Sequence, residues 1–267
     1  MMKFYKYQGA GNDFVLADMR GVSARLSEEV VRRLCDRRFG IGADGFMALE
    51  DDRERQFYMR YYNADGREST MCGNGGRCIA LFAHHLGIGG ALKEFNASDG
   101  YHTAEIKKTE GLAGTVRLKM ADVRGYEKIA EGVFFLNTGS PHYIEFVDDL
   151  DRVDVFARGR EIRYSERFSP GGTNVNFVQI TGPENIRMRT YERGVEAETL
   201  ACGTGATASA IAASLLSGHQ TAAEKTFGVR VEGGMLEVSF TPGPERTFTS
   251  IYLEGPAGKV FECEIEI

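Results

Sequence analysis

The chain has 267 residues, of which 42% are apolar, and its acidic residues exceed its basic residues by six. This length and composition predict one large globular domain or two smaller ones, and the acidic balance argues against a nucleic-acid partner. No apolar run approaches the roughly 18 residues that cross a bilayer, and the first residues lack the apolar core of a secretion signal. Five cysteines without a Cys-x-x-Cys pair indicate a reduced, cytoplasmic protein.

The first half of the chain alternates expected strands with two helices. Ser27 is a plausible N-cap for an amphipathic helix over 28–37, with Leu26 and Val31 as its hydrophobic staple. An apolar helix over 77–86 follows a glycine-rich turn, and Gly87 ends it. Runs of β-branched and aromatic residues predict strands at 56–62 and 115–120. The charged, weakly patterned segment 121–132 is the expected linker.

The second half shows the same alternation. A helix over 206–216 follows a second glycine-rich turn and ends at Gly218. Both this helix and the helix over 77–86 are apolar nearly all round, which predicts that each is buried inside its domain. Strands are expected at 133–137, 175–180, 188–192, 235–240 and 248–253. A last strand over 259–267 is expected to return to the first half.

Four blocks recur in the same order at nearly the same spacing, which is about half the length of the chain and predicts a duplicated domain. The expected fold class is α+β, with two pseudo-repeated domains: residues 1–120 plus 257–267, and residues 121–256. Each would be a curved, mixed, barrel-like sheet around a central buried helix, with the active site in the interdomain cleft. The blocks pair Met71-Cys72-Gly73-Asn74-Gly75-Gly76 with Ala201-Cys202-Gly203-Thr204-Gly205-Ala206, Gly42-Ala43-Asp44 with Gly172-Thr173-Asn174, the Gly9–Phe14 loop with the Gly139–Tyr143 loop, and the Asn63 turn with Glu192-Arg193.

Cys72 and Cys202 each precede a helix in matched glycine loops. The helix dipole and the unpaired N–H groups at such a position favour a thiolate, and the same N–H groups can hold a carboxylate. Two cysteines facing one carbon would let one thiolate remove a proton while the opposite thiol returns one. This pattern predicts inversion at carbon without a metal or cofactor.

Other interpretations of these residues stay open on spacing alone. Asparagines 12, 63, 74 and 174 also suit turns, and His142 suits a surface loop equally well. Glu192-Arg193 would by default be a solvated pair. Gly203-x-Gly205-x-x-Ala208 matches a dinucleotide-binding pattern, but no strand runs straight into that turn.

Taken together, the motifs resemble the diaminopimelate epimerase family over essentially the whole chain. The resemblance implies that Cys72 and Cys202 are the acid and base, and that His142 and Glu192 tune them. It further implies helix-start donors at Gly73, Asn74, Gly203 and Thr204, and substrate contacts from Asn12, Asn63, Asn174, Glu192 and Arg193. The motifs that carry it are Gln8-Gly9-Ala10-Gly11-Asn12-Asp13-Phe14, Asn63-Ala64-Asp65-Gly66, Met71-Cys72-Gly73-Asn74-Gly75, Asn174-Val175-Asn176-Phe177, Tyr191-Glu192-Arg193-Gly194 and Glu198-Thr199-Leu200-Ala201-Cys202-Gly203-Thr204-Gly205.

The same resemblance implies conversion of LL-2,6-diaminopimelate to the meso form, in the route to lysine and to peptidoglycan precursors. It implies a small-molecule substrate, no cofactor, no metal, no membrane or nucleic-acid partner, and a homodimer. One departure is Ser140, which stands where the family usually carries asparagine. Two alternatives stay open: a racemase or epimerase of another amino acid, similar to proline racemase, and a non-catalytic amino-acid binding protein.

Overall fold

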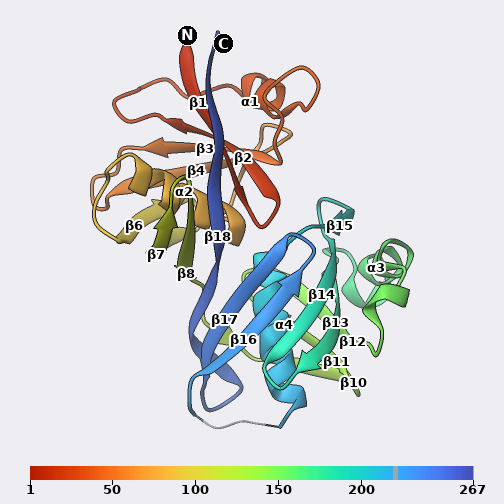
Figure 1. Cartoon of the computed structure of the whole chain (residues 1–267). Coiled ribbons are helices and arrows are strands. Elements are labelled where there is room, and N and C mark those ends of the chain that lie inside the picture. The colour runs from red at the N-terminus through yellow and green to blue at the C-terminus, as the bar shows by residue number, and fades with distance from the viewer. Residues whose placement is uncertain (219–221, 267) are drawn as a thin grey trace. The chain divides into compact units, whose positions relative to one another are not determined.

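A computed structural model of the chain describes residues 1–218 and 222–266. The chain folds into two compact units (Figure 1). Unit 1 runs from Met1 to Leu118 and resumes at Gly255, and unit 2 is Lys119–Glu254. We propose that these units are the two domains expected from the repeat. Residues 219–221 of the expected second domain and residue 267 of the expected first domain lie outside the described residues.

Eight strands of unit 1 pair in a closed ring. Strands β1, β2, β3 and β4 pair in chain order, and β4 then pairs with β6. Strands β6, β7 and β8 also pair in chain order. The ring closes through the later part of β18, which pairs with β8 on one side and with β1 on the other. The β2–β3 and β4–β6 pairs are parallel and the others are antiparallel, so the sheet is mixed. The strands are β1 (Met2–Gly9), β2 (Asn12–Asp18), β3 (Gly45–Glu50), β4 (Phe57–Asn63), β6 (Leu92–Ala97), β7 (Gly100–Glu110), β8 (Ala113–Lys119) and β18 (Thr247–Ile265), with short β5 (Glu68–Ser69) beside β4.

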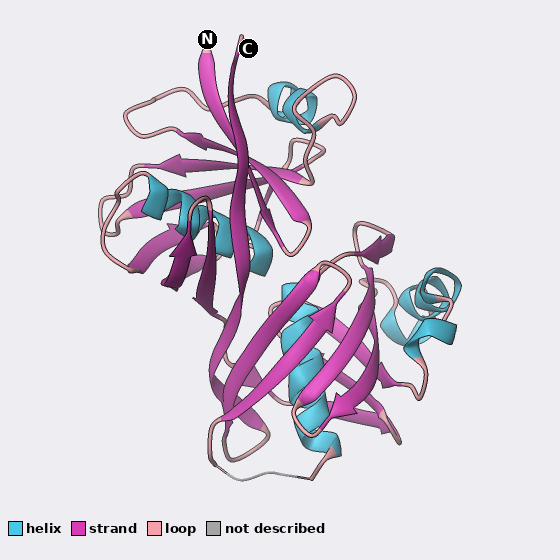
Figure 2. Cartoon of the chain, in the orientation of Figure 1, coloured by secondary structure: helices cyan, strands magenta, loops and turns pink. Residues whose placement is uncertain are grey.

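Each parallel pair needs a crossover connection, and a helix lies in each one. The β4–β6 connection contains α2 (Gly73–His85), drawn in cyan among the strands of unit 1 in Figure 2. Its residues from Gly73 to Ala83 are all buried, as expected for a central helix. The β2–β3 connection contains α1 (Glu28–Cys35), with Ser27 at its N-cap as predicted. It ends two residues before the predicted Arg37, because the backbone at Asp36 is extended.

Unit 2 repeats this order of strands and helices. The β12–β13 and β14–β16 pairs are parallel, and their connections contain α3 (Val155–Arg163) and the buried α4 (Gly203–Leu216). The predicted fold class of two similar halves, each a mixed, curved sheet around a central helix, is confirmed. The other elements are β9 (Val123–Arg124), β10 (Glu127–Ala130), β11 (Val133–Asn137), β12 (Pro141–Phe146), β13 (Asn174–Gly182), β14 (Asn185–Glu192), β15 (Ala197–Thr199), β16 (Lys225–Val231), β17 (Gly234–Pro242), and the 3₁₀ turns Leu150–Arg152 and Glu166–Phe168.

One prediction about connections is wrong and another is correct in part. The expected linker 121–132 contains β9 and β10, which pair with β18 and β11. The last strand does return to the first half, because the later part of β18 pairs with β1 and β8 in unit 1. It is not a separate strand, however: it continues from the strand expected at 248–253, whose residues pair with β17 in unit 2.

The outer helices are held by apolar contacts. Val31, Leu34 and Cys35 of α1 pack against alternate side chains of β2 and β3, and Val155 of α3 packs against Val175 and Phe177 of β13. Within the described part of the chain, no helix has the length and apolar character needed to cross a membrane.

Candidate active site

The sulfur of Cys72 lies at the start of the central helix of unit 1. Cys72 is the N-cap residue of α2, and its Sγ accepts a hydrogen bond from the backbone N–H of Gly75 at 3.2 Å. A Cβ on Gly75 would lie 3.1 Å from this sulfur, so glycine allows the close approach. A bonded N–H and the positive end of the helix dipole both favour the thiolate.

Asn12 and Asn74 contact one another beside Cys72. The Asn74 amide donates to Oδ1 of Asn12 at 3.2 Å, and the Asn12 amide donates to Oδ2 of Asp44 at 2.6 Å. Asn63, by contrast, ends β4 and is exposed, and the described residues give its side chain no hydrogen bond to this group. The structure therefore joins two of the three predicted asparagines of unit 1.

Arg77 is a member of this group that the sequence analysis did not identify. Its side chain is fully buried, and the guanidinium donates to Oδ1 of Asn74 at 2.9 Å and to the carbonyls of Gly73 and Pro256 at 3.2 and 3.4 Å. No carboxylate of a described residue forms an ion pair with it. Burial lowers its pKa, but an arginine stays charged in proteins. A buried positive charge therefore lies next to Gly73 and Asn74, in the first turn of α2.

The sulfur of Cys202 has different surroundings at the start of α4. Cys202 is the N-cap residue, but its side chain makes no capping hydrogen bond. Its Sγ lies 3.5 Å from the hydroxyl of Thr204, and that hydroxyl lies 3.0 Å from Nε2 of His142. Burial, with a smaller effect of the Arg193 charge, lowers the pKa of His142 to about 3, so this imidazole is neutral at physiological pH.

Asn174 connects the turn before β12 to Arg193. The Asn174 amide donates to Oγ of Ser140 at 3.0 Å, and its Oδ1 accepts from the backbone N–H of Arg193 at 2.8 Å. The guanidinium of Arg193 is half-buried and reaches the carbonyl of Gly171 at 3.4 Å. Ser140, His142 and Thr204 are mutually within hydrogen-bond distance, so these residues form one connected set.

Glu192 lies at the end of β14, next to β15. Its Oε2 accepts a hydrogen bond from the hydroxyl of Thr199 at 2.9 Å, and both residues are half-buried. The carboxylate is therefore fixed by the short strand that precedes Cys202.

The repeat extends to side-chain contacts. Asn12 and His142 occupy matched positions, separated by the same interval as the two cysteines, and so do Asn74 and Thr204. In each unit the side chain two residues after the cysteine contacts a side chain at the start of a strand, Asn12 of β2 in unit 1 and His142 of β12 in unit 2. The same contact is therefore made by two amides in unit 1 and by a hydroxyl and an imidazole in unit 2.

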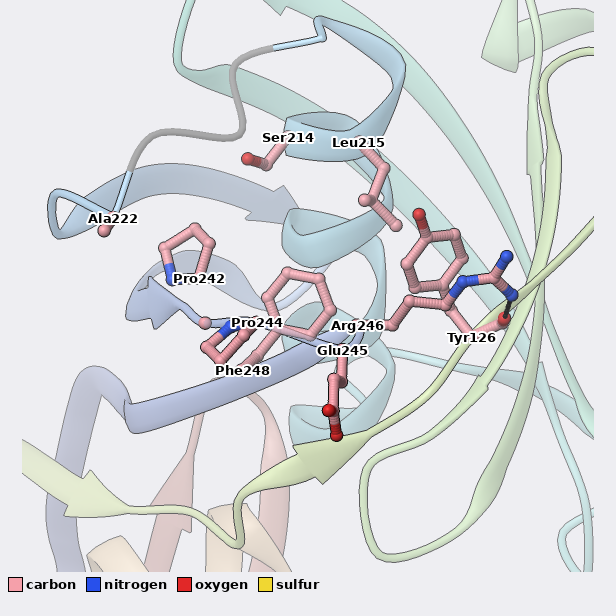
Figure 3. A pocket seen from close by; sticks show the side chains of 10 residues that line it. Tyr126, Ser214, Leu215, Ala222, Pro242, Pro244, Glu245, Arg246 and Phe248 are labelled. Atoms are coloured by element: carbon pink, nitrogen blue, oxygen red, sulfur yellow. Dashed lines mark hydrogen bonds between the residues drawn. The ribbon is translucent and has the colours of Figure 1, made fainter.

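A cavity in unit 2 lies beside the last turn of α4 (Figure 3). It has a volume of about 360 Å³, and Ser214 and Leu215 of the last turn of α4 line it together with the Pro242–Arg246 turn and Phe248. Because Cys202 is at the opposite end of the same helix, this cavity does not include the predicted site residues. The described residues contain no group of three His, Cys, Asp or Glu side chains arranged to hold a metal ion.

Comparison with known proteins gives the family. A family model for diaminopimelate epimerase matches residues 4–124 and 134–260. The chain belongs to the diaminopimelate epimerase family. Among similar proteins, a diaminopimelate epimerase of Flavobacterium psychrophilum is 48% identical over 99% of this chain and 100% of its own length. One of Chlorobaculum tepidum is 44% identical over 97% and 99%, and one of Aquifex aeolicus is 41% identical over 98% and 96%. The chain is therefore an enzyme of the isomerase class.

Solved structures share the fold at low identity. A phenazine biosynthesis protein of the PhzF family from Bacillus anthracis has a TM-score of 0.79 at 16% identity, covering 100% of this chain and 99% of its own. A probable proline racemase from Agrobacterium radiobacter has a TM-score of 0.71 at 14% identity, covering 100% and 93%. At such identities the likeness establishes the fold alone.

Proposed function

We propose that this enzyme epimerises LL-2,6-diaminopimelate to meso-diaminopimelate, without a cofactor, using Cys72 and Cys202 as its two acid/base groups. The observation that carries the proposal is the matched position of the two cysteines, each at the N-cap of a buried central helix in a chain of this family. One sulfur as thiolate takes the proton from the α-carbon. The other, as thiol, delivers a proton to the opposite face, and the carbon is inverted.

The helix starts supply the second requirement, which is to stabilise negative charge. When the α-proton leaves, charge develops on the α-carboxylate, and hydrogen-bond donors aimed at that charge lower the barrier. The N–H groups that begin α2 and α4, at Gly73, Asn74, Gly203 and Thr204, are donors of this kind.

The other end of the substrate carries a second ammonium and carboxylate, which need opposite charges once they leave water. In this proposal the planar guanidinium of Arg193 binds the distal carboxylate and Glu192 accepts from the distal ammonium. The amides of Asn12, Asn63 and Asn174 complete the polar contacts. The Arg193 guanidinium donates to the Gly171 carbonyl, and the Glu192 carboxylate accepts from Thr199. These bonds support the two roles, because groups held in place lose little entropy on binding.

We further propose the pathway, the cell compartment and the oligomeric state of the enzyme. Its product would serve lysine and peptidoglycan-precursor biosynthesis in the cytoplasm, where five cysteines without a disulfide are expected. We also propose a homodimer, which light scattering coupled to size-exclusion chromatography tests. A mass twice that of the 29.5 kDa chain supports a dimer, and the mass of a single chain contradicts it.

Proton NMR of LL-diaminopimelate with the purified enzyme in deuterated water tests the function. The expected result is loss of one α-proton signal per inverted carbon, with meso product carrying deuterium there. L-proline and other amino acids serve as comparison substrates. Exchange confined to another amino acid would replace the substrate assignment, and binding without any exchange would refute the two-base reaction.

A further inference from the structure

Asn176, on β13, makes three hydrogen bonds that determine how its amide is oriented. Its Nδ2 lies 2.9 Å from the carbonyl oxygen of Tyr143 and 3.1 Å from Nδ1 of His142, and its Oδ1 accepts from the hydroxyl of Thr190 at 2.9 Å. A carbonyl oxygen only accepts hydrogen bonds, so the atom facing Tyr143 must be the NH₂ group. The same NH₂ therefore donates to Nδ1 of His142.

This contact determines the proton position on His142. A nitrogen that accepts a hydrogen bond carries no proton, so the neutral imidazole must carry its proton on Nε2. His142 is fully buried, which disfavours the charged form that would place a second proton on Nδ1. Nε2–H then faces two hydroxyl oxygens, of Ser140 and Thr204, each at 3.0 Å.

The orientation continues to the sulfur of Cys202. The Ser140 hydroxyl already accepts from the Asn174 amide. Because the Thr204 hydroxyl accepts from Nε2–H, its own proton is free to point at Sγ of Cys202, 3.5 Å away. In the other tautomer, Nε2 would accept and would draw the Thr204 proton away from the sulfur.

We propose that Asn176 is a positioning residue that holds His142 in the Nε2–H tautomer, so that the Thr204 hydroxyl donates to the sulfur of Cys202 and stabilises its thiolate. The effect on turnover rests on the proposed function, in which Cys202 is an acid/base group. The tautomer and the thiolate stabilisation do not depend on it.

The repeat shows that the fold alone does not require an amide at this position. The equivalent residue in unit 1 is the buried Met47, whose sulfur faces Gly75 of α2 as the Asn176 amide faces Gly205 of α4. Burying an amide costs free energy unless its groups are bonded, and Asn176 is fully buried with its partners all in place. A Cβ on Gly205 would lie 2.5 Å from Oδ1 of Asn176, so the start of α4 also leaves room for this side chain.

The Asn176→Asp variant tests the proposal at constant size. A carboxylate only accepts, so it would favour a proton on Nδ1 of His142. Two-bond ¹⁵N–¹H NMR correlations of histidine should place the proton on Nε2 in the unaltered enzyme and on Nδ1, or on both nitrogens, in the variant. An Nδ1–H tautomer in the unaltered enzyme would overturn the proposal.

Thiol alkylation measures the consequence for Cys202. With iodoacetamide and peptide mapping, we expect alkylation of Cys202 to slow by about 10-fold in the Asn176→Asp variant, as expected for loss of a hydrogen bond to a charged group. Cys72 is the internal control, because its sulfur accepts from the Gly75 N–H and should keep its rate within about 2-fold.

A second variant keeps the test decisive if Asn176→Asp does not fold. Thr204→Val removes the hydroxyl at similar size and leaves Asn176 and His142 in place. It should slow alkylation of Cys202 while His142 keeps its proton on Nε2, and Thr204→Ser should restore the rate. Unchanged Cys202 reactivity in folded Thr204→Val would refute the donor chain, whether or not the enzyme acts on diaminopimelate.

Discussion

Cys72 and Cys202 begin equivalent helices, yet their sulfurs contact different donors. Cys72 Sγ accepts a backbone N–H, whereas Cys202 Sγ lies beside the Thr204 hydroxyl, which connects to a neutral histidine. A backbone donor cannot be altered by a side-chain change, but a hydroxyl can. We therefore expect a substitution of Thr204 to change the reactivity of the Cys202 thiol and to leave that of Cys72 unchanged.

Replacing either thiol should abolish epimerisation. In the proposed reaction each face of the α-carbon has one acid/base group, and losing such a group costs about 10²- to 10⁴-fold in rate. Cys72→Ala and Cys202→Ala should each lose at least this factor in a coupled assay of meso product. Near-normal turnover by Cys72→Ala would contradict the two-base mechanism.

Cys35→Ala is the matched control for the thiol variants. Cys35 is buried against the sheet by α1, and burial raises the pKa of its thiol to about 12, so it stays protonated and unreactive. Its loss should leave turnover within a few-fold of normal. A large loss would show that general damage to the fold, rather than loss of chemistry, explains the other two variants.

Arg193→Lys should fail as a replacement. Lysine keeps the charge but loses the planar fork that binds a carboxylate through two hydrogen bonds. We expect kcat/KM for LL-diaminopimelate to fall by about 10-fold or more, in line with the loss of charge-assisted bonds. L-lysine and L-proline, which lack the distal pair of charges, should be poorer than LL-diaminopimelate by about 10⁴-fold with unaltered enzyme. Comparable values for the three substrates would contradict the roles of Arg193 and Glu192.

The sequence was informative about site residues where a motif repeats and uninformative where partners come from different strands. Spacing alone singled out both cysteines and the turns after them. It gave no sign that Asn176 bonds His142, since that contact depends on the parallel pairing of β12 with β13. The sequence did mark the two asparagines as unusual, because Asn174 and Asn176 alternate with Val175 and Phe177 in the buried first part of β13. Arg77 carried a similar signal as the one basic residue between Gly73 and Ala83.

At the level of single elements, α1 offers a clean test of helix capping. The Ser27 hydroxyl accepts from the backbone N–H of Val30 at 3.3 Å, and Ser27 is exposed. Ser27→Ala should reduce the free energy of unfolding by about 1 kcal/mol, the usual effect of losing an N-cap, with turnover unchanged. Urea titration followed by circular dichroism measures it.

Ser23→Ala is the control for the cap, because Ser23 is also exposed and precedes the helix. It should change the unfolding free energy by less than about 0.5 kcal/mol. Equal effects of the two substitutions would show that the cap contributes nothing particular to α1.

Elements with a local signal were predicted more often than those made by distant pairing. The cap at Ser27 and the glycines after α2 and α4 are local signals, and these three helices lie near their predicted ranges, although α2 and α4 begin four and three residues earlier. The helix α3 was not predicted, although Asp154 caps it. By contrast, β9 and β10 are two and four residues long, and only their partners β18 and β11 make them strands. The continuity of β18 was missed because Gly255, Pro256 and Gly258 interrupt its pattern like a turn.

For the molecule as a whole, His142 should make stability depend on pH. Its folded-state pKa of about 3 is below the value near 6.5 of an unfolded histidine. Above pH 6.5 neither state binds the proton. Below it the unfolded state does, so stability is lost as pH falls, by up to about 1.4 kcal/mol per pH unit until the folded-state pKa is reached.

Unfolding free energies between pH 4.5 and 6.5 check this dependence against His142→Gln, which cannot titrate. The unaltered enzyme should lose stability more steeply than the variant over that range. Parallel curves for the two proteins would mean that His142 is already protonated in the folded state.

A chain cut after Glu254 should damage unit 1 and spare unit 2. The cut removes the part of β18 that pairs with β1 and β8, and leaves both strands with unpaired edges. All of unit 2, residues 119–254, remains. Hydrogen exchange read by mass spectrometry should show lost protection in β1 and β8 with β13 and β14 still protected. Retained protection in β1 would show that the ring does not depend on its eighth strand.

The shared strand β18 also sets an order of events during translation. The ribosome makes the residues of unit 1 first, but the strand that completes its ring is made only after the whole of unit 2. The second half of the chain can therefore finish folding while the first half still waits with two open strand edges. In a cell, the older half of each nascent chain would be the one that needs protection from aggregation by chaperones.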